Sequence, residues 1–183
     1  MMSRLDETDF KILRAVQGDA TLSSAQVAEQ VGMSQSPAWR RMANLEETGA
    51  IKKRVTLIDR HLVGLHFMVY ILIRLKDQTQ KTVDEFQSRV RGIPEIMQCH
   101  MLMGDIDFML LAITEDLEAY HKLLREEISR IPGVNGIDSR VVVEETKNTT
   151  ELPLDGLAKK SKETQPDEVL ARSTHRSIGI PTK

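Results

Sequence analysis

Residues 23–45, SSAQVAEQVGMSQSPAWRRMANL, contain two short helix-forming segments that meet at Gly32-Met33. Ser23 and Gln26 have the spacing of a capping box, which predicts the start of the first of these helices. Glycine readily adopts the left-handed conformation at which helices end, so we expect this helix to stop at Gly32. The stretch therefore predicts a helix, a tight turn and a second helix.

The second helix of this stretch is expected to have Ser34 as its N-terminal cap, Pro37 in its first turn, and Met42 and Leu45 on its buried face. In its N-terminal half, hydrogen-bonding or cationic side chains are expected to be exposed on the outer face: Ser34, Gln35, Ser36, Trp39, Arg40, Arg41 and Asn44. In a helix-turn-helix, such residues enter the DNA major groove, where Arg binds guanine edges or phosphates and Gln and Asn pair with adenine edges. The alternatives are a solvated face for the arginine pair and a core or dimer contact for Trp39.

Another helix is predicted before this stretch and an extended segment after it. Asp6 is placed to cap a helix whose apolar residues recur every three positions and which ends at Gly18-Asp19. Residues 51–57 are typical of a strand or an extended arm with Lys52 and Arg54 on one side. These two cations either add phosphate contacts beside the second helix or belong to a solvated linker.

The net charge of the 183-residue chain is −2, which on its own argues against a nucleic-acid partner. Residues 34–60, however, carry six Lys or Arg and three Asp or Glu, a local charge of +3, whereas residues 61–150 carry −4. Because a partner responds to the local surface charge, the whole-chain value does not exclude DNA.

The composition also limits the class of protein. No stretch has the roughly 18 uninterrupted apolar residues of a membrane helix, and the N-terminus lacks the apolar core of a secretory signal, so we expect a cytoplasmic protein without a membrane partner. The single cysteine, Cys99, excludes an internal disulfide and a multi-thiolate zinc site. No metal-ligand, phosphate-loop or Ser-His-Asp pattern is present, so neither a metal nor a cofactor is expected.

The middle of the chain alternates between strand and helix patterns. Strands are predicted at 67–75, 95–103, 107–114 and 136–145, and helices at 80–91 and 116–130. In the second helix, Leu117, Tyr120, Leu124 and Ile128 are expected to face inward. The β-α-β-β-α-β order is that of a ferredoxin-like sandwich, an antiparallel sheet with helices on one face.

The predicted strands remain apolar on both sides, as in Met101-Leu102-Met103, in residues 108–111 and in Val141-Val142-Val143. An isolated domain would expose that apolar surface to water. Self-association is therefore expected, and a two-fold dimer also suits a protein that reads two DNA half-sites.

From residue 3 to residue 154, the chain resembles the Lrp/AsnC family of transcription regulators. Five segments carry the resemblance: residues 5–13 (LDETDFKIL), 34–41 (SQSPAWRR), 45–51 (LEETGAI), 104–107 (GDID) and 149–154 (TTELPL). The resemblance implies a winged or plain helix-turn-helix, a hinge strand, and an αβ sandwich. In this family the sandwich forms dimers, then tetramers or octamers, and binds amino acids or related small molecules between dimers.

In the family, the turn that matches residues 104–107 contributes to the effector pocket, which implies that Gly104, Asp105 and Asp107 bind the effector. The facing strand residues Met101 and Met103 are further candidates, suited to an apolar side chain. A turn of this kind holds a carboxylate with its free N–H groups and an ammonium with an Asp. The alternatives are that the residues only make the hairpin turn and that the two methionines only pack.

The expected fold class is therefore α+β. We predict a helix-turn-helix DNA-binding domain at 1–50, a hinge strand or linker at 51–65, and a ferredoxin-like effector-binding and oligomerisation domain at 66–154. Residues 155–183 extend past the usual end of the family and are polar and interrupted by proline, so we expect them to form a disordered C-terminal tail without a core of its own.

The expected function is transcription regulation, with double-stranded DNA and an amino-acid-like effector as partners and no enzymatic activity. An enzyme is the main alternative, because the sirohaem decarboxylases resemble this family in both domains. In that case His61, His66, His100 and His121 would be candidate haem or substrate contacts, whereas Cys99 is expected to be a packed thiol in a buried strand. A DNA-organising protein without an effector is a third possibility.

Overall fold

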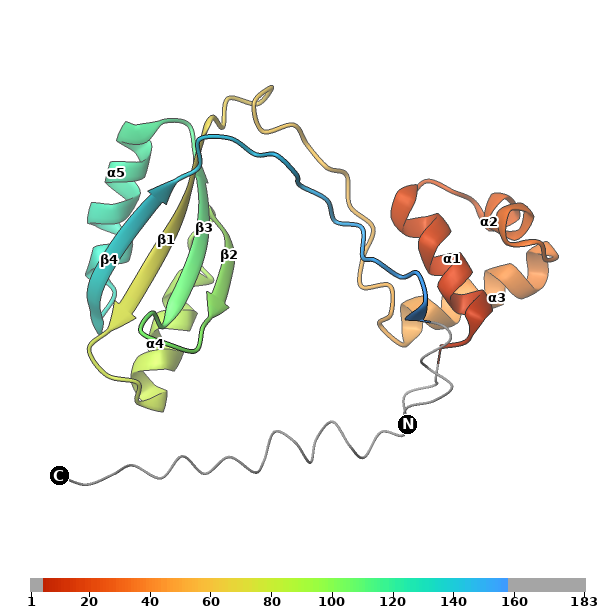
Figure 1. Cartoon of the computed structure of the whole chain (residues 1–183), viewed down its shortest axis with the longest axis horizontal. Coiled ribbons are helices and arrows are strands. Elements are labelled where there is room, and N and C mark those ends of the chain that lie inside the picture. The colour runs from red at the N-terminus through yellow and green to blue at the C-terminus, as the bar shows by residue number, and fades with distance from the viewer. Residues whose placement is uncertain (1–4, 158–183) are drawn as a thin grey trace. The chain divides into compact units, whose positions relative to one another are not determined.

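The computed structural model describes residues 5–157, which form two compact units, residues 5–56 with residues 149–157, and residues 57–148. We call these the head and the sandwich (Figure 1). Residues 158–183, most of the predicted tail, lie outside the described residues. Within the described residues, no helix is long and apolar enough to cross a membrane.

The head contains three helices: α1 Glu7–Gly18, α2 Ser24–Val31 and α3 Gln35–Glu47. The predicted capping box of α2 is confirmed, because Ser23 Oγ accepts the Gln26 N–H at 3.3 Å and Gln26 Oε1 accepts the Ser23 N–H at 2.9 Å. The predicted cap of α1 is also confirmed, with Asp6 Oδ1 accepting the Asp9 N–H at 2.8 Å.

The turn between α2 and α3 depends on Gly32, whose φ of +73° lies in the left-handed region. The Met33 N–H donates to the Ala28 carbonyl at 2.9 Å, which closes the end of α2. Ser34 occupies the predicted cap position of α3, but its side chain makes no capping hydrogen bond, so that part of the prediction is wrong. The head core combines residues from all three helices and the first turn: Ile12, Leu22, Val27, Met42 and Leu45.

The sandwich has the predicted β-α-β-β-α-β order. Its elements are β1 Phe67–Leu75, α4 Gln80–Val90, β2 Ile96–Met101, β3 Phe108–Thr114, α5 Leu117–Glu126, a short 3-10 helix at Ile128–Arg130, and β4 Val134–Val141. The strands form one antiparallel sheet in the order β2-β3-β1-β4. The fold is therefore the expected α+β class with a helical head.

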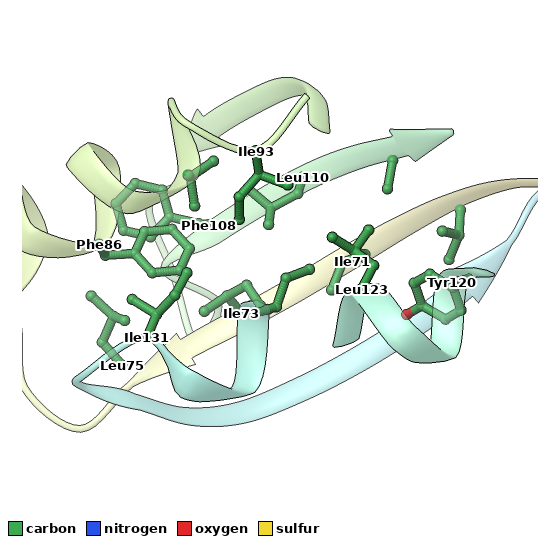
Figure 2. Packing of buried hydrophobic residues seen from close by; sticks show 14 of the residues in the cluster. Ile71, Ile73, Leu75, Phe86, Ile93, Phe108, Leu110, Tyr120, Leu123 and Ile131 are labelled. Atoms are coloured by element: carbon green, nitrogen blue, oxygen red, sulfur yellow. The ribbon is translucent and has the colours of Figure 1, made fainter. Parts of the chain in front are cut away.

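The sandwich core lies between the sheet and the two helices α4 and α5, which cover the same face (Figures 1 and 2). Phe86 of α4 and Phe108 of β3 are fully buried, and their ring centroids lie 4.6 Å apart. Tyr120 of α5 lies at the other end of the cluster (Figure 2). Its hydroxyl is hydrogen-bonded to Ser139 of β4.

Successive side chains of a strand point to opposite faces, so the residues that alternate with the core residues of β1 and β3 lie on the face without helices. They are Met68, Tyr70, Leu72, Met109, Leu111 and Ile113. We call this set the open face. The sequence predicts an apolar second side of the sheet, but of the residues on which that prediction rests only Met109 and Leu111 belong to the open face. Leu102, Met103, Val142 and Val143 lie outside the strands.

Two further expectations for local structure differ from the structure. Of the two alternatives for residues 51–57, a strand or an extended arm, the strand is not formed, since no strand within the described chain pairs with these residues. Leu117, expected to face inward, is 50 % exposed although it lies one turn before Tyr120, because it is the first residue of α5 and lies at the end of the helix. Leu123 is buried instead, one turn after Tyr120.

Candidate functional site

The N-terminal half of α3 exposes most of the side chains that the sequence places there. Met42 and Leu45 are buried, as predicted. The exposed residues are Ser34, Gln35, Ser36, Trp39, Arg40 and Asn44. Trp39 is 62 % exposed, so it is not a residue of the head core.

Arg40 and Arg41 differ in their surroundings although they are adjacent. Arg40 is exposed and makes no ion pair within residues 5–157. Arg41 is partly buried, and its Nη1 donates to Asp6 Oδ2 at 2.8 Å and to Asp9 Oδ1 at 2.7 Å. The sequence pattern does not distinguish the two arginines, whereas the structure pairs only Arg41 with α1.

The charges of this network stabilise one another. The hydrogen bonds to Asp9 and then to Asp6 raise the pKa of Arg41 above its ordinary value, although burial acts in the opposite direction. Burial acts to raise the pKa of Asp6, but the Asp9 N–H and Arg41 outweigh it and lower that pKa below its ordinary value. Arg41 and Asp6 are therefore both held in their charged forms at neutral pH.

The two cations after α3 that were predicted to contact DNA, Lys52 and Arg54, also differ in their surroundings. Lys52 is exposed. Arg54 donates from Nη2 to Glu46 Oε1 at 3.0 Å and from Nη1 to the Ala20 carbonyl at 3.1 Å, so it links the end of α3 to the turn before α2. This pairing leaves Lys52 as the more accessible cation of the two.

In the sandwich, the predicted effector residues lie around the turn between β2 and β3. Gly104 has a φ of +132°, which favours glycine, and the Leu102 N–H donates to the Asp107 carbonyl at 2.8 Å. Asp105 is exposed at this turn, Met103 is fully accessible, and Met101 is 58 % exposed.

Asp107, by contrast, is only 8 % exposed, and both of its carboxylate oxygens have partners within the chain. Oδ2 accepts the Leu75 N–H at 2.7 Å, and Oδ1 accepts a hydrogen from Gln78 Nε2 at 2.7 Å. Asp107 thus joins the β2–β3 turn to the end of β1. Sequence reasoning missed this role because the two partners are distant in the chain.

A cavity of about 310 Å³ lies between α4 and the edge strand β2. Its lining residues are Gln87, Val90, Arg91, Ile96, Met97, Gln98, Cys99, Met101 and Phe108. Among the predicted effector residues only Met101 contributes, so the cavity and the turn at Gly104 are separate features. Nothing in the sequence pattern pointed to Gln87 or Arg91.

Cys99 is exposed, so its prediction as a residue of a buried strand is wrong. The reason is that β2 is an edge strand in the sheet order, and no further strand pairs with it within the described chain. Partial burial of the thiol nevertheless raises the pKa of Cys99 above its usual range, with Arg91 acting in the opposite direction. The thiol is therefore a weak nucleophile at neutral pH.

The histidines of the enzyme alternative do not form one site. The rings of His61 and His66 lie 5.7 Å apart. His100 pairs with Met109 across the sheet and so belongs to the face without helices, whereas His121 is on α5, which covers the other face. Within residues 5–157, no group of three or more His, Cys, Asp or Glu side chains is arranged to hold a metal ion.

A helix-turn-helix with a polar, cationic helix surface, followed by an antiparallel βαββαβ sandwich, is the architecture of a two-domain DNA-binding regulator. Residues 5–52 match the family described as winged helix-turn-helix DNA-binding, and residues 68–152 match the Lrp/AsnC ligand binding domain. The chain belongs to the Lrp/AsnC family of transcription regulators.

Individual relatives agree with this assignment. The chain is 32 % identical over 151 residues to the transcriptional regulator AzlB of Bacillus subtilis, covering 82 % of this chain and 96 % of the relative. It is 36 % identical over 154 residues to the glutamate uptake regulatory protein of Zymomonas mobilis, covering 84 % and 93 %. A solved transcriptional regulator of Neisseria meningitidis in complex with L-Met is 31 % identical, with a TM-score of 0.79 and coverage of 84 % and 99 %.

The chain is thus a DNA-binding transcription regulator with a ligand-binding domain, and the family is one of regulators and not of enzymes. The regulator interpretation of the sequence is confirmed over the sirohaem decarboxylase alternative.

Proposed function

We propose that the exposed row on α3 makes the DNA contacts, with two protomers placing their α3 helices in successive major grooves of double-stranded DNA. The observation that carries this proposal is the exposure of Arg40 together with Gln35 and Asn44 on a helix whose opposite side is buried. Arg40 would bind a guanine edge or a phosphate, and the two amides would pair with adenine edges.

The remaining proposed contacts are Ser34, Ser36 and Trp39 on α3 and Lys52 after it. The guanidinium of Arg41 is paired with Asp6 and Asp9, and that of Arg54 is paired with Glu46. We therefore do not include these two arginines among the proposed DNA contacts. Since DNA is the partner, we place the protein in the prokaryotic cytoplasm, associated with the nucleoid.

The protein acts as a homo-oligomer, in this proposal, because the open face is apolar and polar groups border it on both sides. His100 of β2 lies at one edge, and Asp138 and Arg140 of β4, paired at 2.7 Å, lie at the other. An apolar centre with a polar rim is typical of an interface between protein chains. Dimers formed through this face would assemble further into tetramers or octamers.

Replacing Leu72, a partly exposed residue of the open face, with Glu is expected to reduce the protein to a folded monomer. A carboxylate in the middle of an apolar interface is desolvated without a partner, which strongly opposes association. Light scattering coupled to size exclusion measures the mass, and circular dichroism confirms folding. Leu117→Glu, on an exposed position of the helical face, is the matched control and should keep the wild-type mass. A Leu72→Glu protein of unchanged mass would contradict this dimer.

The effector, in this proposal, is an amino acid or a related small metabolite that binds at the β2–β3 turn. The carboxylate of Asp105 would hold an ammonium group, Gly104 would allow close approach of the backbone, and Met101 and Met103 would contact an apolar side chain. Asp107 would position the turn through Leu75 and Gln78. The relative from Neisseria meningitidis, which was solved with L-Met, supports this ligand class.

A screen of amino acids by thermal shift is expected to find ligands that raise the melting temperature, because a ligand that binds only the folded state stabilises it. Asp105→Asn should abolish or strongly reduce these shifts, since the neutral amide no longer attracts an ammonium group. Asp84→Asn on α4, an exposed residue away from the turn, is the control and should retain them. An unchanged set of ligands and shifts in Asp105→Asn would exclude Asp105 from the site.

A further inference from the structure

Arg41 closes a hydrogen-bond network that uses all four carboxylate oxygens of Asp6 and Asp9. Asp6 Oδ1 accepts the Asp9 N–H at 2.8 Å, and Asp9 Oδ2 accepts the Asp6 N–H at 3.0 Å. The two remaining oxygens, Asp6 Oδ2 and Asp9 Oδ1, both accept from Arg41 Nη1, at 2.8 and 2.7 Å. The network therefore joins the first turn of α1 to the middle of α3.

The position of Arg41 on α3 explains why it turns inward. Residues three and four apart lie on the same side of a helix, so Arg41 follows Ala38 and precedes Leu45, both fully buried, along one side. Arg40 falls instead in the row of Ser36 and Asn44, which is exposed. A single step of about 100° around the helix separates an outward cation from one that borders the core.

We propose that Arg41 is a positioning residue: it fixes the orientation of α3 against the capped end of α1, and Arg40, not Arg41, meets the DNA. This inference rests on the proposed role of α3 as the DNA-reading helix. Asp9 is only 8 % exposed, so its carboxylate needs the cation of Arg41 as a partner. Removing Arg41 leaves the buried Asp9 Oδ1 without its partner, and removing the charge of Asp9 leaves Arg41 with Asp6 as its only anionic partner in the network, so either change weakens the attachment of α3 to α1.

Electrostatics alone predicts the opposite outcome for Asp9. A carboxylate near a DNA-binding surface repels phosphates, and its removal would ordinarily strengthen DNA binding. If Arg41 were a phosphate contact, losing Asp9 would also free its guanidinium for DNA. A positioning role predicts that loss of the negative charge at Asp9 weakens recognition, and this difference in sign makes the proposal testable.

The test uses the full-length protein and two duplexes of equal length, one selected by the wild-type protein from a random-sequence pool and one of random sequence. The variants are Asp9→Asn, Arg41→Ala, their combination, and Arg40→Ala. Affinity is measured over a series of salt concentrations, at a temperature where circular dichroism shows each variant folded. If Arg41→Ala does not fold, Asp9→Asn alone still tests the proposal, because its DNA affinity should fall if Arg41 is a positioning residue and rise if only electrostatics matters.

Asp9→Asn and Arg41→Ala are each expected to weaken binding to the selected duplex by about tenfold or more, because breaking this part-buried charge pair loosens α3 and the DNA must then select the correct orientation of the helix. Binding to the random duplex and the salt dependence of affinity should remain as in the wild type. The affinity of the double variant should be no lower than that of the single variant that binds more weakly, because both changes break the same network. Arg40→Ala should instead reduce the slope of log affinity against log salt by about one per protomer.

Three results would overturn the proposal. The first is stronger binding by Asp9→Asn, the second is a salt slope that Arg41→Ala reduces as Arg40→Ala does, and the third is a lower melting temperature of both single variants with unchanged affinity. Failure of the proposed function is recognised separately: the wild-type protein would then select no sequence, or Arg40→Ala would leave both the affinity for the selected duplex and the salt slope unaltered.

Discussion

Arg40→Glu is expected to lower the affinity for selected operator DNA by about 2–6 kcal/mol per dimer, or roughly 30- to 10⁴-fold. The range assumes that each of two protomers loses one contact worth about 1–3 kcal/mol. Arg40 is exposed in the outward row of α3 and has no ion pair within the described chain, so the substitution removes a contact without breaking a packing interaction. Fluorescence anisotropy with a labelled duplex at fixed salt measures the change.

The control for this prediction is Arg125→Glu, which makes the same charge change at an exposed position in the last turn of α5. It should leave DNA affinity close to that of the wild type, because the charge that matters is local to the recognition helix. Equal losses in the two variants would mean that DNA responds to the net charge of the protein and not to α3.

Local signals made the head and the strand pattern predictable. The caps at Asp6 and Ser23 involve residues three positions apart, so the sequence contains both partners within one helical turn. The apolar run of residues 67–75 coincides with β1. Such elements are readable because their determinants lie within a few residues of one another.

Several of the wrong or incomplete predictions concern residues whose partners are distant in the chain. Arg41 is 35 residues from Asp6, and Asp107 is 32 residues from Leu75, so neither pairing has a signature at short range. The exposure of Cys99 follows from the order of strands in the sheet, which places β2 at an edge. Side-chain types identified candidate sites, but tertiary structure decided which of these groups remain accessible.

Phe108→Ala is expected to lower the free energy of unfolding of the sandwich by about 3–5 kcal/mol, the usual cost of removing a large aromatic ring from a packed core. Phe108 is fully buried, and its ring packs against that of Phe86, which would be left facing a cavity (Figure 2). Chemical denaturation monitored by circular dichroism measures the loss. A cost below 1 kcal/mol would require the core to refill the space, which close-packed interiors do poorly.

The same substitution tests whether the two units have independent cores. The head cluster around Ile12 and Leu45 shares no residue with the sandwich cluster around Phe108. Hydrogen exchange in Phe108→Ala should therefore accelerate in β1 and β3 and remain slow in α2 and α3, because local stability follows the core that each element packs on. Leu45→Ala should give the reverse pattern. If either variant accelerated exchange equally in both units, head and sandwich would unfold as one cooperative body, and effector binding to the sandwich would stabilise the DNA-binding helices directly.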